Sequence, residues 1–456
     1  MRSEDTPLDA AIRGLASGAR KLARVVDVTR PEAWTALDEG IRIAIGYGEI
    51  ERPAHPWTST GRLPAALRAV LRSPAPTEAG LALALCDPSG LIREAALPHA
   101  AGRPAVLPLV AIRTTDWAAP VREKAETVLA EALRGADSGT LALTAPVILR
   151  IRRRMRGGTA AALLDEALRA APAATVSALL LSQDRTTRRF AFGIAVERGL
   201  LTPAELARTA AYDGDMAVQD IAATAALAAG VPDDTLPLLL AARSGRVRSA
   251  GVTALRKAGR AAEAEPFLHD RSGMVRACAR WVLRQDGHDP VALYRAACAD
   301  PATVPDRAPL GLAECGDPKR DAEALWELTG HERALVRSSA VAGLRTFEVA
   351  DFTRLLPLLD DPAAGVVREA ARALLPWADR LPEEEFLRRT GPGRPPHVRV
   401  RALLLLREHG SAAYEKTVRR LLDDPDPVLR LRVRSALGIE EPAPRSQGGP
   451  SRFWRT

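Results

Sequence analysis

The densest group of chemically active side chains in the sequence is a run of arginines in the segment VILRIRRRMRGG. No acidic residue occurs between positions 145 and 164, and the run comprises Arg150, Arg152, Arg153, Arg154 and Arg156. Guanidinium groups bind phosphates and carboxylates through charge-assisted hydrogen bonds, so the run is a candidate site for an anionic partner. The alternative interpretation is a solvated helix face, because phosphate-binding surfaces usually combine several aligned clusters.

Groups suited to catalysis or metal binding are scattered. A catalytic site needs an acid, a base, a nucleophile or metal ligands that converge. The chain has seven His residues, and it contains no C-x-x-C, Gly-rich phosphate loop, nucleophile elbow or H-E-x-x-H. Small buried apolar side chains are the interpretation for the four cysteines, Cys86, Cys278, Cys298 and Cys315. The sequence predicts no catalytic residue, metal or cofactor, and it does not favour an enzyme.

Composition limits the class of protein. Hydrophobic residues make up 47% of the 456 residues and aromatic residues only 4%, as in a core of Ala, Leu and Val between stacked helices. The net charge is +8, and only five of the 64 basic residues are Lys. This skew indicates a compositional bias, so nucleic acid is permitted as a partner and not required. No signal segment and no apolar run of about 18 residues is found, so we expect no membrane span and a reduced, cytoplasmic location.

A motif that returns about every 30 residues organises the chain. It can be anchored on Arg93, Arg122, Arg189, Gln219, Arg248, Arg276, Arg337, Arg368, Arg401 and Arg430. The residue before an anchor is usually Val, Ile or Leu, the third after it is often Ala and the seventh is often Leu. These positions share one stripe of a helix. Two doubled intervals predict degenerate units near Arg154 and Asp306.

Each unit is predicted to be a helical hairpin. First helices are expected over Pro104–Arg113, Thr235–Ala242, Pro290–Ala299, Phe352–Leu359 and Tyr414–Leu422. Turns such as Asp361-Pro362 precede the second helices, since Asp can cap a helix and Pro fits its first turn. Glycines in the left-handed conformation are expected to end the second helices, at Gly102, Gly135, Gly199, Gly230, Gly259, Gly287, Gly410 and Gly438.

This pattern resembles HEAT repeats, and most closely the bacterial phycobilisome-lyase-type HEAT subgroup, with its D-x-x-x-x-V-R-x-x-A-x-x-x-L core. Asp stands six residues before Arg in Asp87/Arg93, Asp116/Arg122, Asp270/Arg276 and Asp424/Arg430. The resemblance implies that these residues form a structural ladder between turns. Gln219 departs from the pattern, His331 stands where Asp is expected and should act as a variant cap, and the register between Thr140 and Asp184 is least defined.

Some proteins with HEAT-like repeats are enzymes, and the sequence can be compared with them. HEAT hydroxylases that hold a di-iron centre use four His-Glu dipeptides, whereas His331-Glu332 is the one copy here. No tetrapyrrole site is recognisable. The alkylpurine DNA glycosylases are also HEAT-like and use concave aromatic residues. Aromatic side chains are available here at Trp117, Trp281, Trp326 and Trp377, but they do not align with that family's residues, and filling an Ala-rich layer is the simpler role for them.

We therefore predict an all-α fold, an armadillo/HEAT-like α-solenoid superhelix of roughly a dozen helical hairpins. Residues 1–62 should form an N-terminal helical cap and loop, residues 63–438 the solenoid and residues 439–456 a disordered tail. The predicted function is a non-enzymatic scaffold that binds a protein or peptide in its concave groove. The alternative is a nucleic-acid-binding array, such as one that recognises DNA lesions. The sequence does not identify the partner.

Overall fold

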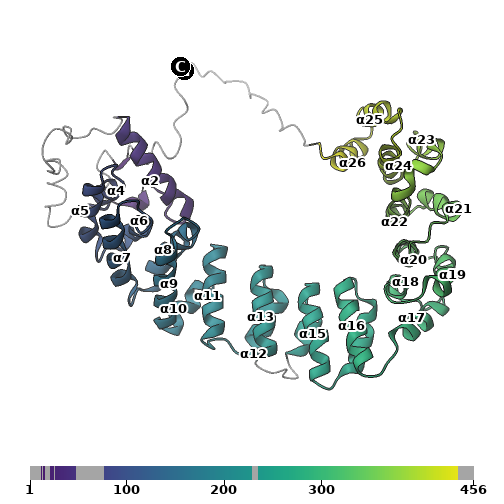
Figure 1. Cartoon of the computed structure of the whole chain (residues 1–456), viewed down its shortest axis with the longest axis horizontal. Helices are drawn as coiled ribbons and strands as arrows, with labels where there is room; N and C mark the ends of the chain where they lie inside the picture. The colour runs from purple at the N-terminus through teal and green to yellow at the C-terminus, as the bar shows by residue number, and fades with distance from the viewer. Residues whose placement is uncertain are drawn as a thin grey trace, which may run out of the picture. The chain divides into compact units, whose positions relative to one another are not determined.

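The structure is a computed structural model, and it describes residues 12, 14–15, 21–24, 26–47, 76–228 and 235–439. Within these residues every element is an α-helix or a 3-10 helix, as Figure 1 shows. Most helices pack as consecutive antiparallel pairs joined by short turns. The predicted all-α class and solenoid organisation are confirmed. No helix of the described part is long and apolar enough to cross a membrane.

Contacts divide the chain into two compact units, Met1–Leu238 and Leu239–Thr456, a division that the sequence did not predict. The hairpins of the first unit are α4 (Glu78–Leu85) with α5 (Gly90–Ala100), η3 and α6 (Pro104–Val106, Leu107–Arg113) with α7 (Ala119–Leu133), α8 (Ser138–Ile151) with α9 (Gly158–Ala170), α10 (Ala173–Leu179) with α11 (Arg185–Glu197), and α12 (Pro203–Tyr212) with α13 (Met216–Ala228).

The second unit continues the same order after α14 (Leu236–Leu240), which spans the division between the units. Its elements are α15 (Gly245–Lys257), η4 (Ala261–His269) with α16 (Gly273–Gln285), α17 (Pro290–Ala299) with α18 (Ala308–Ala313), α19 (Pro318–Leu328) with α20 (Ala334–Thr346), α21 and η5 (Phe352–Leu355, Leu356–Asp360) with α22 (Ala364–Leu374), η6 and α23 (Leu375–Arg380, Glu383–Arg389) with α24 (Pro396–His409), and α25 (Tyr414–Leu422) with α26 (Pro427–Leu437). Hairpins are present in both doubled intervals, as α8/α9 and α17/α18.

Local sequence explains where the second helices begin and end. A glycine with positive φ follows many of them, as predicted at Gly102, Gly135, Gly199, Gly259, Gly287, Gly410 and Gly438, whereas Gly230 lies outside the described residues. This left-handed conformation costs a glycine nothing, so it ends the helix cleanly. Predicted first helices over Pro290–Ala299 and Tyr414–Leu422 have the same bounds as α17 and α25.

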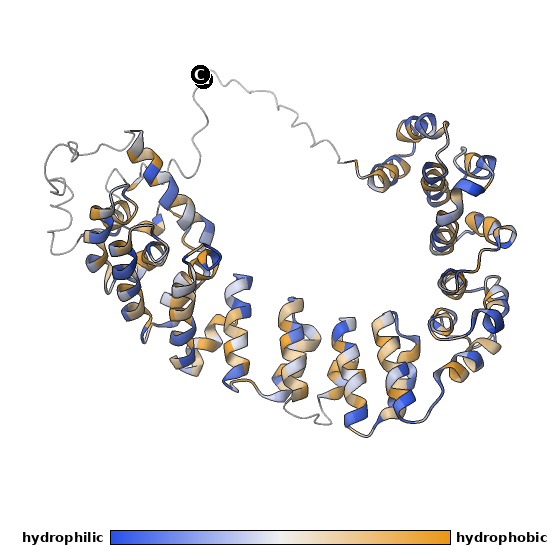
Figure 2. Cartoon of the chain, viewed as in Figure 1, coloured by the Kyte–Doolittle hydropathy of each residue, from blue (hydrophilic) through white to orange (hydrophobic). Residues whose placement is uncertain are grey.

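The core lies between neighbouring helices and is built from Ala, Leu and Val (Figure 2). On α20, for example, Val336, Ala340 and Leu344 are fully buried. These are the stripe positions that the repeat predicts, with Ala where two helices approach closely. Each hairpin therefore has to be covered by its neighbours, which is the physical basis of a solenoid.

Helix α2 (Pro31–Gly46) supports the third hairpin of the first unit. It packs against α6 and α8, with Trp34 and Leu37 fully buried. The backbone N–H of Leu22, in η1 (Leu22–Arg24), donates to Glu78 Oε2 at 2.9 Å and ties this region to α4. Most of residues 1–25, the loop from residue 48 and the predicted tail after residue 439 lie outside the described residues.

Candidate functional site

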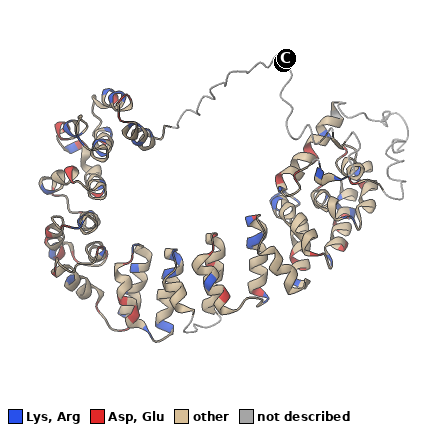
Figure 3. Cartoon of the chain, turned by 180° about the vertical axis from the view of Figure 1, so that it is seen from behind, with Lys and Arg blue, Asp and Glu red and all other residues tan. Residues whose placement is uncertain are grey.

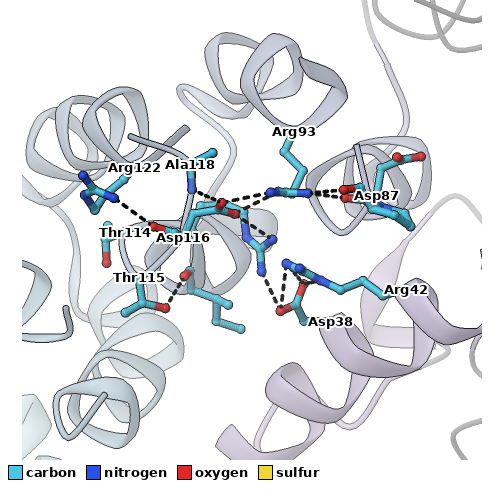
Figure 4. A network of polar contacts seen from close by, with 12 residues as sticks. Asp38, Arg42, Asp87, Arg93, Thr114, Thr115, Asp116, Ala118 and Arg122 are labelled. Carbon is cyan, nitrogen blue, oxygen red and sulfur yellow. Dashed lines mark hydrogen bonds and ion pairs between the residues drawn. The ribbon is translucent and has the colours of Figure 1, made fainter. Parts of the chain in front are cut away.

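The predicted Asp and Arg residues form a ladder, with a geometry that differs from the expected one. We call the fourth residue of each second helix the ladder residue, and the residue three positions before that helix the turn residue. Arg93, the ladder residue of α5, donates from Nε and Nη2 to both carboxylate oxygens of Asp116 at 2.8 and 2.9 Å (Figure 4). Asp116 is the turn residue of the next hairpin. The ladder therefore joins successive hairpins.

Within one hairpin the contact is made through the backbone. The side chains of Arg93, Arg122, Arg276 and Arg430 donate from Nη1 to the carbonyl oxygens of Asp87, Asp116, Asp270 and Asp424, respectively, at 2.7, 3.0, 2.7 and 2.5 Å. Asp116 and Asp270 thus hold Arg122 and Arg276 through their backbone carbonyls, while their carboxylates bind Arg93 and Arg248 of the preceding hairpins. Each turn carboxylate also accepts the backbone N–H two residues on, as Asp270 Oδ1 does from Ser272 at 2.7 Å.

The same contact recurs in both units. Ladder arginines bind the carboxylate of the next turn in the pairs Arg93–Asp116, Arg188–Asp213, Arg248–Asp270, Arg337–Asp361 and Arg399–Asp424. Three sequence anchors were therefore wrong. The ladder residues are Arg188, Val367 and Arg399, in place of Arg189, Arg368 and Arg401. An arginine one or two positions further on made each of these positions ambiguous, and only the helix start resolves them.

With two exceptions, a ladder arginine and an acidic turn residue in the following hairpin are present or absent together. Neither charge occurs where the ladder residue is Ala161, Gln219, Gly311 or Val367 and the following turn residue is Ser182, Ala242, His331 or Gly393. Gln219 keeps only the bond to its own turn, from Nε2 to the Asp213 carbonyl at 2.5 Å. Leaving one buried charge without its partner would cost several kcal/mol, which explains the joint loss.

Two ladder arginines depart from this rule. Arg122 faces a turn without an acid, and its one partner among the described residues is the Asp116 carbonyl. Arg276 instead binds Glu314, which Arg280 Nη1 also contacts at 2.5 Å. Both Arg276 and Arg280 are buried, so Glu314 replaces the missing turn carboxylate for two guanidinium groups.

His331 acts as the predicted variant cap. Its Nδ1 accepts the backbone N–H of Arg333 at 2.9 Å, which is the bond that a turn Asp makes, and Nε2 lies 2.8 Å from the Pro301 carbonyl oxygen. Because Nδ1 accepts, Nε2 carries the proton in this arrangement. The role of His331 is therefore structural.

The first ladder step belongs to a buried ionic network (Figure 4). The guanidinium of Arg113, 2% exposed, contacts Asp38 of α2 at 2.5 Å and Asp116 at 3.3 Å. Burial lowers the pKa of Arg113. Burial alone would raise the pKa of Asp116, yet the bonds from Arg93 and the Ala118 N–H hold it below its usual value. Asp116 is therefore a carboxylate shared by two hairpins and linked to α2.

The arginine run lies at the end of α8 and in the turn that follows. Arg150 is in the last turn of α8, whereas Arg152, Arg153, Arg154 and Arg156 lie beyond the helix end at Ile151 and are exposed. The turn is tight, because a Cβ on Gly157 would lie 2.1 Å from the carbonyl oxygen of Ile151. The five arginines therefore do not share one helix face, which was the alternative interpretation of the run from the sequence.

A pocket of about 570 Å³ lies beside this run. Its lining includes Arg150 and residues 152–154, together with Glu32 of α2 and Asp184 at the start of α11. Arg150 Nη1 is bonded to Glu32 Oε1 at 2.8 Å, and Asp184 accepts the Thr187 N–H at 2.7 Å. Arg152 and Arg153 make no hydrogen bond or ion pair with the described residues. The pocket thus has free cationic donors and two carboxylates on its wall.

We expect the arginine run to bind nucleic acid weakly and without sequence preference. Fluorescence anisotropy with labelled DNA and RNA should give dissociation constants no tighter than about 1 µM, lost as salt rises from about 50 to 200 mM. The variant Arg152→Glu/Arg153→Glu/Arg154→Glu should remove the remaining signal. Sub-micromolar binding at about 200 mM salt that this variant abolishes would favour the nucleic-acid alternative.

A second pocket, of about 370 Å³, is lined by residues of α17 and α19. Two of its charged groups are paired with each other, since Arg295 donates from Nε and Nη2 to the carboxylate of Asp321 at 2.8 and 3.0 Å. Burial and the nearby Asp321 raise the pKa of the Cys298 thiol to about 12, which keeps it protonated and unreactive near neutral pH. No group of three possible metal ligands occurs among the described residues.

Several side chains lie elsewhere than the sequence predicted. Trp326 is buried, but Trp117 and Trp281 are 70% and 43% exposed, so two of the four tryptophans do not fill a layer. Cys86 and Cys298 are buried, whereas Cys278 and Cys315 are partly exposed. Arg256 stacks over the Trp281 ring, with Cζ 5.4 Å from the ring centroid. Periodicity alone could not separate inward from outward positions on such short helices.

Comparisons with known proteins add little to this geometry. No family model matches the chain. No curated protein matches it either. Among solved structures, karyopherin Kap121p bound to the SUMO protease Ulp1p has 12% identity and a TM-score of 0.31 over 83% of this chain and 49% of that chain. This chain therefore spans about half the length of that protein.

Two further structures show similarly low likeness. An engineered protein has 14% identity and a TM-score of 0.21, over 95% of this chain and 98% of its own. A structure of tubulin recruitment by microtubule polymerases with Tumor Overexpressed Gene domain arrays has 13% identity and a TM-score of 0.22, over 76% and 91%. None of these values is evidence of a shared function.

Proposed function

We propose that the chain is a non-enzymatic scaffold that holds a protein or peptide along the exposed face of its second helices. The proposal includes the HEAT-type assignment with its phycobilisome-lyase-type subgroup. It also includes the division into an N-terminal cap and loop (1–62), a solenoid (63–438) and a tail (439–456). Its main support is a row of exposed apolar side chains at one position of the repeat.

The second residue of several second helices is large, apolar and exposed. Met274, Leu335 and Val428 of the second unit are each more than half exposed, and we call them the apolar row. In the first unit Leu91 of α5 has the same position and is also exposed. The second residue lies two positions before the ladder residue, about 200° away around the helix, so it points away from the ladder.

The apolar row favours a protein partner over nucleic acid. Isolated exposed apolar residues need no explanation, but recurrence at one position places them on one side of the array. Protein interfaces bury apolar and aromatic side chains together with arginine, and Trp281 with Arg256 supplies such a pair on neighbouring second helices. A nucleic-acid partner would instead require cations that recur along the array.

The variant Met274→Ser/Leu335→Ser/Val428→Ser should lose partners without unfolding. These side chains are already exposed, so the unfolding midpoint should change little, while capture of bound proteins from the native host should fall about tenfold or more. Quantitative mass spectrometry of the captured proteins measures the change. The control is Leu375→Ser, an exposed apolar residue of η6. Equal capture by the triple variant and the wild type would contradict the proposal.

A further inference from the structure

One buried carboxylate of the second unit is surrounded by more arginines than it can balance. Glu369 of α22 is 7% exposed. Its Oε1 accepts bonds from Arg368 Nε at 3.2 Å and from Arg372 Nη1 at 2.9 Å, and its Oε2 lies 3.7 Å from Arg345 Nη2 on α20. No bond in this group is bidentate, unlike those of the ladder residues Arg93, Arg248 and Arg337. The arginines therefore keep most of their donors unused.

A further arginine approaches from the next second helix. Arg401 of α24 is partly buried, and it makes no hydrogen bond or ion pair with any residue that the structure describes. Burial, and then the positive charges of Arg372 and Arg368, lower its pKa. Glu369 thus contacts three guanidinium groups from α20 and α22, and Arg401 lies on α24, which packs against α22, so this group of four arginines and one acid carries a net charge of +3. Figure 3 shows charged residues on these helices.

A bound anion would complete this arrangement. Neighbouring like charges repel, and a carboxylate between the arginines would relieve that repulsion beyond what solvent screening does. The ladder position of this helix is Val367, so none of these arginines makes the ladder contact there. Their half-exposed side chains can instead reach a ligand: Arg345, Arg368 and Arg372 are 42%, 47% and 58% exposed.

We propose that Arg368, Arg372 and Arg401 form a binding site for a carboxylate side chain of an acidic peptide segment. This deepens the proposed function and rests on it, because it names the chemistry of the scaffold's partner. Leu335 of α20 and Val428 of α26 are exposed apolar residues of second helices that pack against α22 and α24, so the same helices offer both apolar and charged contacts. A cluster confined to three helices suits one or two acidic side chains, whereas a nucleic-acid strand needs a longer basic track.

The test uses the full chain and a fluorescein-labelled peptide of six glutamates, followed by fluorescence anisotropy at low salt. Arg401→Gln should weaken binding about tenfold, and Arg401→Lys should weaken it less because the charge is kept. Arg419→Gln removes an exposed arginine from the first helix α25 and should change binding less than about twofold. Circular dichroism melts establish that each variant is folded.

The variant Glu369→Gln gives the sharpest result. It removes the internal competitor and frees the donors of Arg368 and Arg372, so the labelled peptide should bind several-fold more tightly. A purely structural Glu369 would instead lower the melting temperature and leave the affinity of the peptide unchanged. If this variant does not fold, the Arg401 variants still decide the question.

Other outcomes are equally decisive. No binding of the peptide by the wild type, or equal binding by wild type and Arg401→Gln, would overturn the site. The proposed function would survive that result if the apolar-row variant still loses its captured partners. Tighter binding of a DNA oligomer than of the peptide, weakened by Arg401→Gln, would also overturn the choice of an acidic peptide. Competition by millimolar inorganic phosphate as effective as by unlabelled peptide would assign the site to free anions.

Discussion

Replacing Arg93 by Met should destabilise the first unit by about 3–5 kcal/mol, one of the largest effects expected for a single substitution in this chain. Arg93 is fully buried, and the Asp116 side chain is 1% exposed. The substitution leaves the Asp116 carboxylate with the Ala118 N–H and a 3.3 Å contact to Arg113, and it removes the donor that Nη1 supplies to the carbonyls of Asp87 and Pro88. Urea unfolding followed by circular dichroism measures the change.

Arg122→Met is the matched control for this prediction. Arg122 has the same ladder position and the same bond to its own turn, but no carboxylate from the next turn, so a cost of only about 0.5–1.5 kcal/mol is expected. In a double-mutant cycle, Asp116→Asn keeps an acceptor for the Ala118 N–H. The double variant should then be less destabilised than the sum of the two single variants. Equal effects of Arg93→Met and Arg122→Met would disprove the inter-hairpin ladder.

Gly311→Ala should destabilise the second unit by about 2–4 kcal/mol. A Cβ at Gly311 would lie 2.2, 2.4 and 2.6 Å from Cε1, Cζ and the hydroxyl oxygen of Tyr294. That ring is fully buried, and its hydroxyl donates to the Leu268 carbonyl at 2.6 Å, so it cannot move without losing a buried hydrogen bond. Overpacking costs about 1–3 kcal/mol, and the lost bond adds about 1 kcal/mol. Thermal unfolding gives the measurement.

Gly193→Ala provides the contrast. Gly193 is inside α11, and a Cβ there meets nothing within 4 Å, so the alanine should stabilise the helix by about 0.5–1 kcal/mol. The double variant Gly311→Ala/Tyr294→Leu should recover much of the loss, since leucine lacks the ring atoms that clash. An unchanged melting temperature for Gly311→Ala alone would show that Tyr294 does not fill the ladder position of α18.

The sequence predicted the repeat and its helices because both follow from local rules. The spacing of apolar residues, with Pro290 at the start of α17, placed α17 and α25 to the residue. The partner of each ladder arginine was not predictable in this way. Asp116 follows Arg93 by 23 residues and Asp424 follows Arg399 by 25, so only the stacking of hairpins brings them together.

The candidate sites were harder to predict than the fold. The arginine run drew attention because five arginines are close in sequence, yet Arg150 is bonded to Glu32 from a helix more than one hundred positions earlier. The cluster around Glu369 was not predicted, because Arg345 and Arg401 come from other repeats. Its one sequence signal is an acid with arginines one position before and three after it, in a helix where the ladder residue is Val367.

The joint presence of ladder and turn charges has a consequence for evolution by duplication. The exchangeable module is not the hairpin, because its arginine is neutralised by the hairpin that follows. A deletion or insertion that joins Arg337 to a turn without Asp would leave a partly buried cation without its carboxylate. The junctions that follow the hairpins of Gln219 and Val367 have no ladder charge, so a change there leaves no cation unpaired. Gain and loss of repeats should therefore concentrate at those two junctions, and engineered truncations should end there.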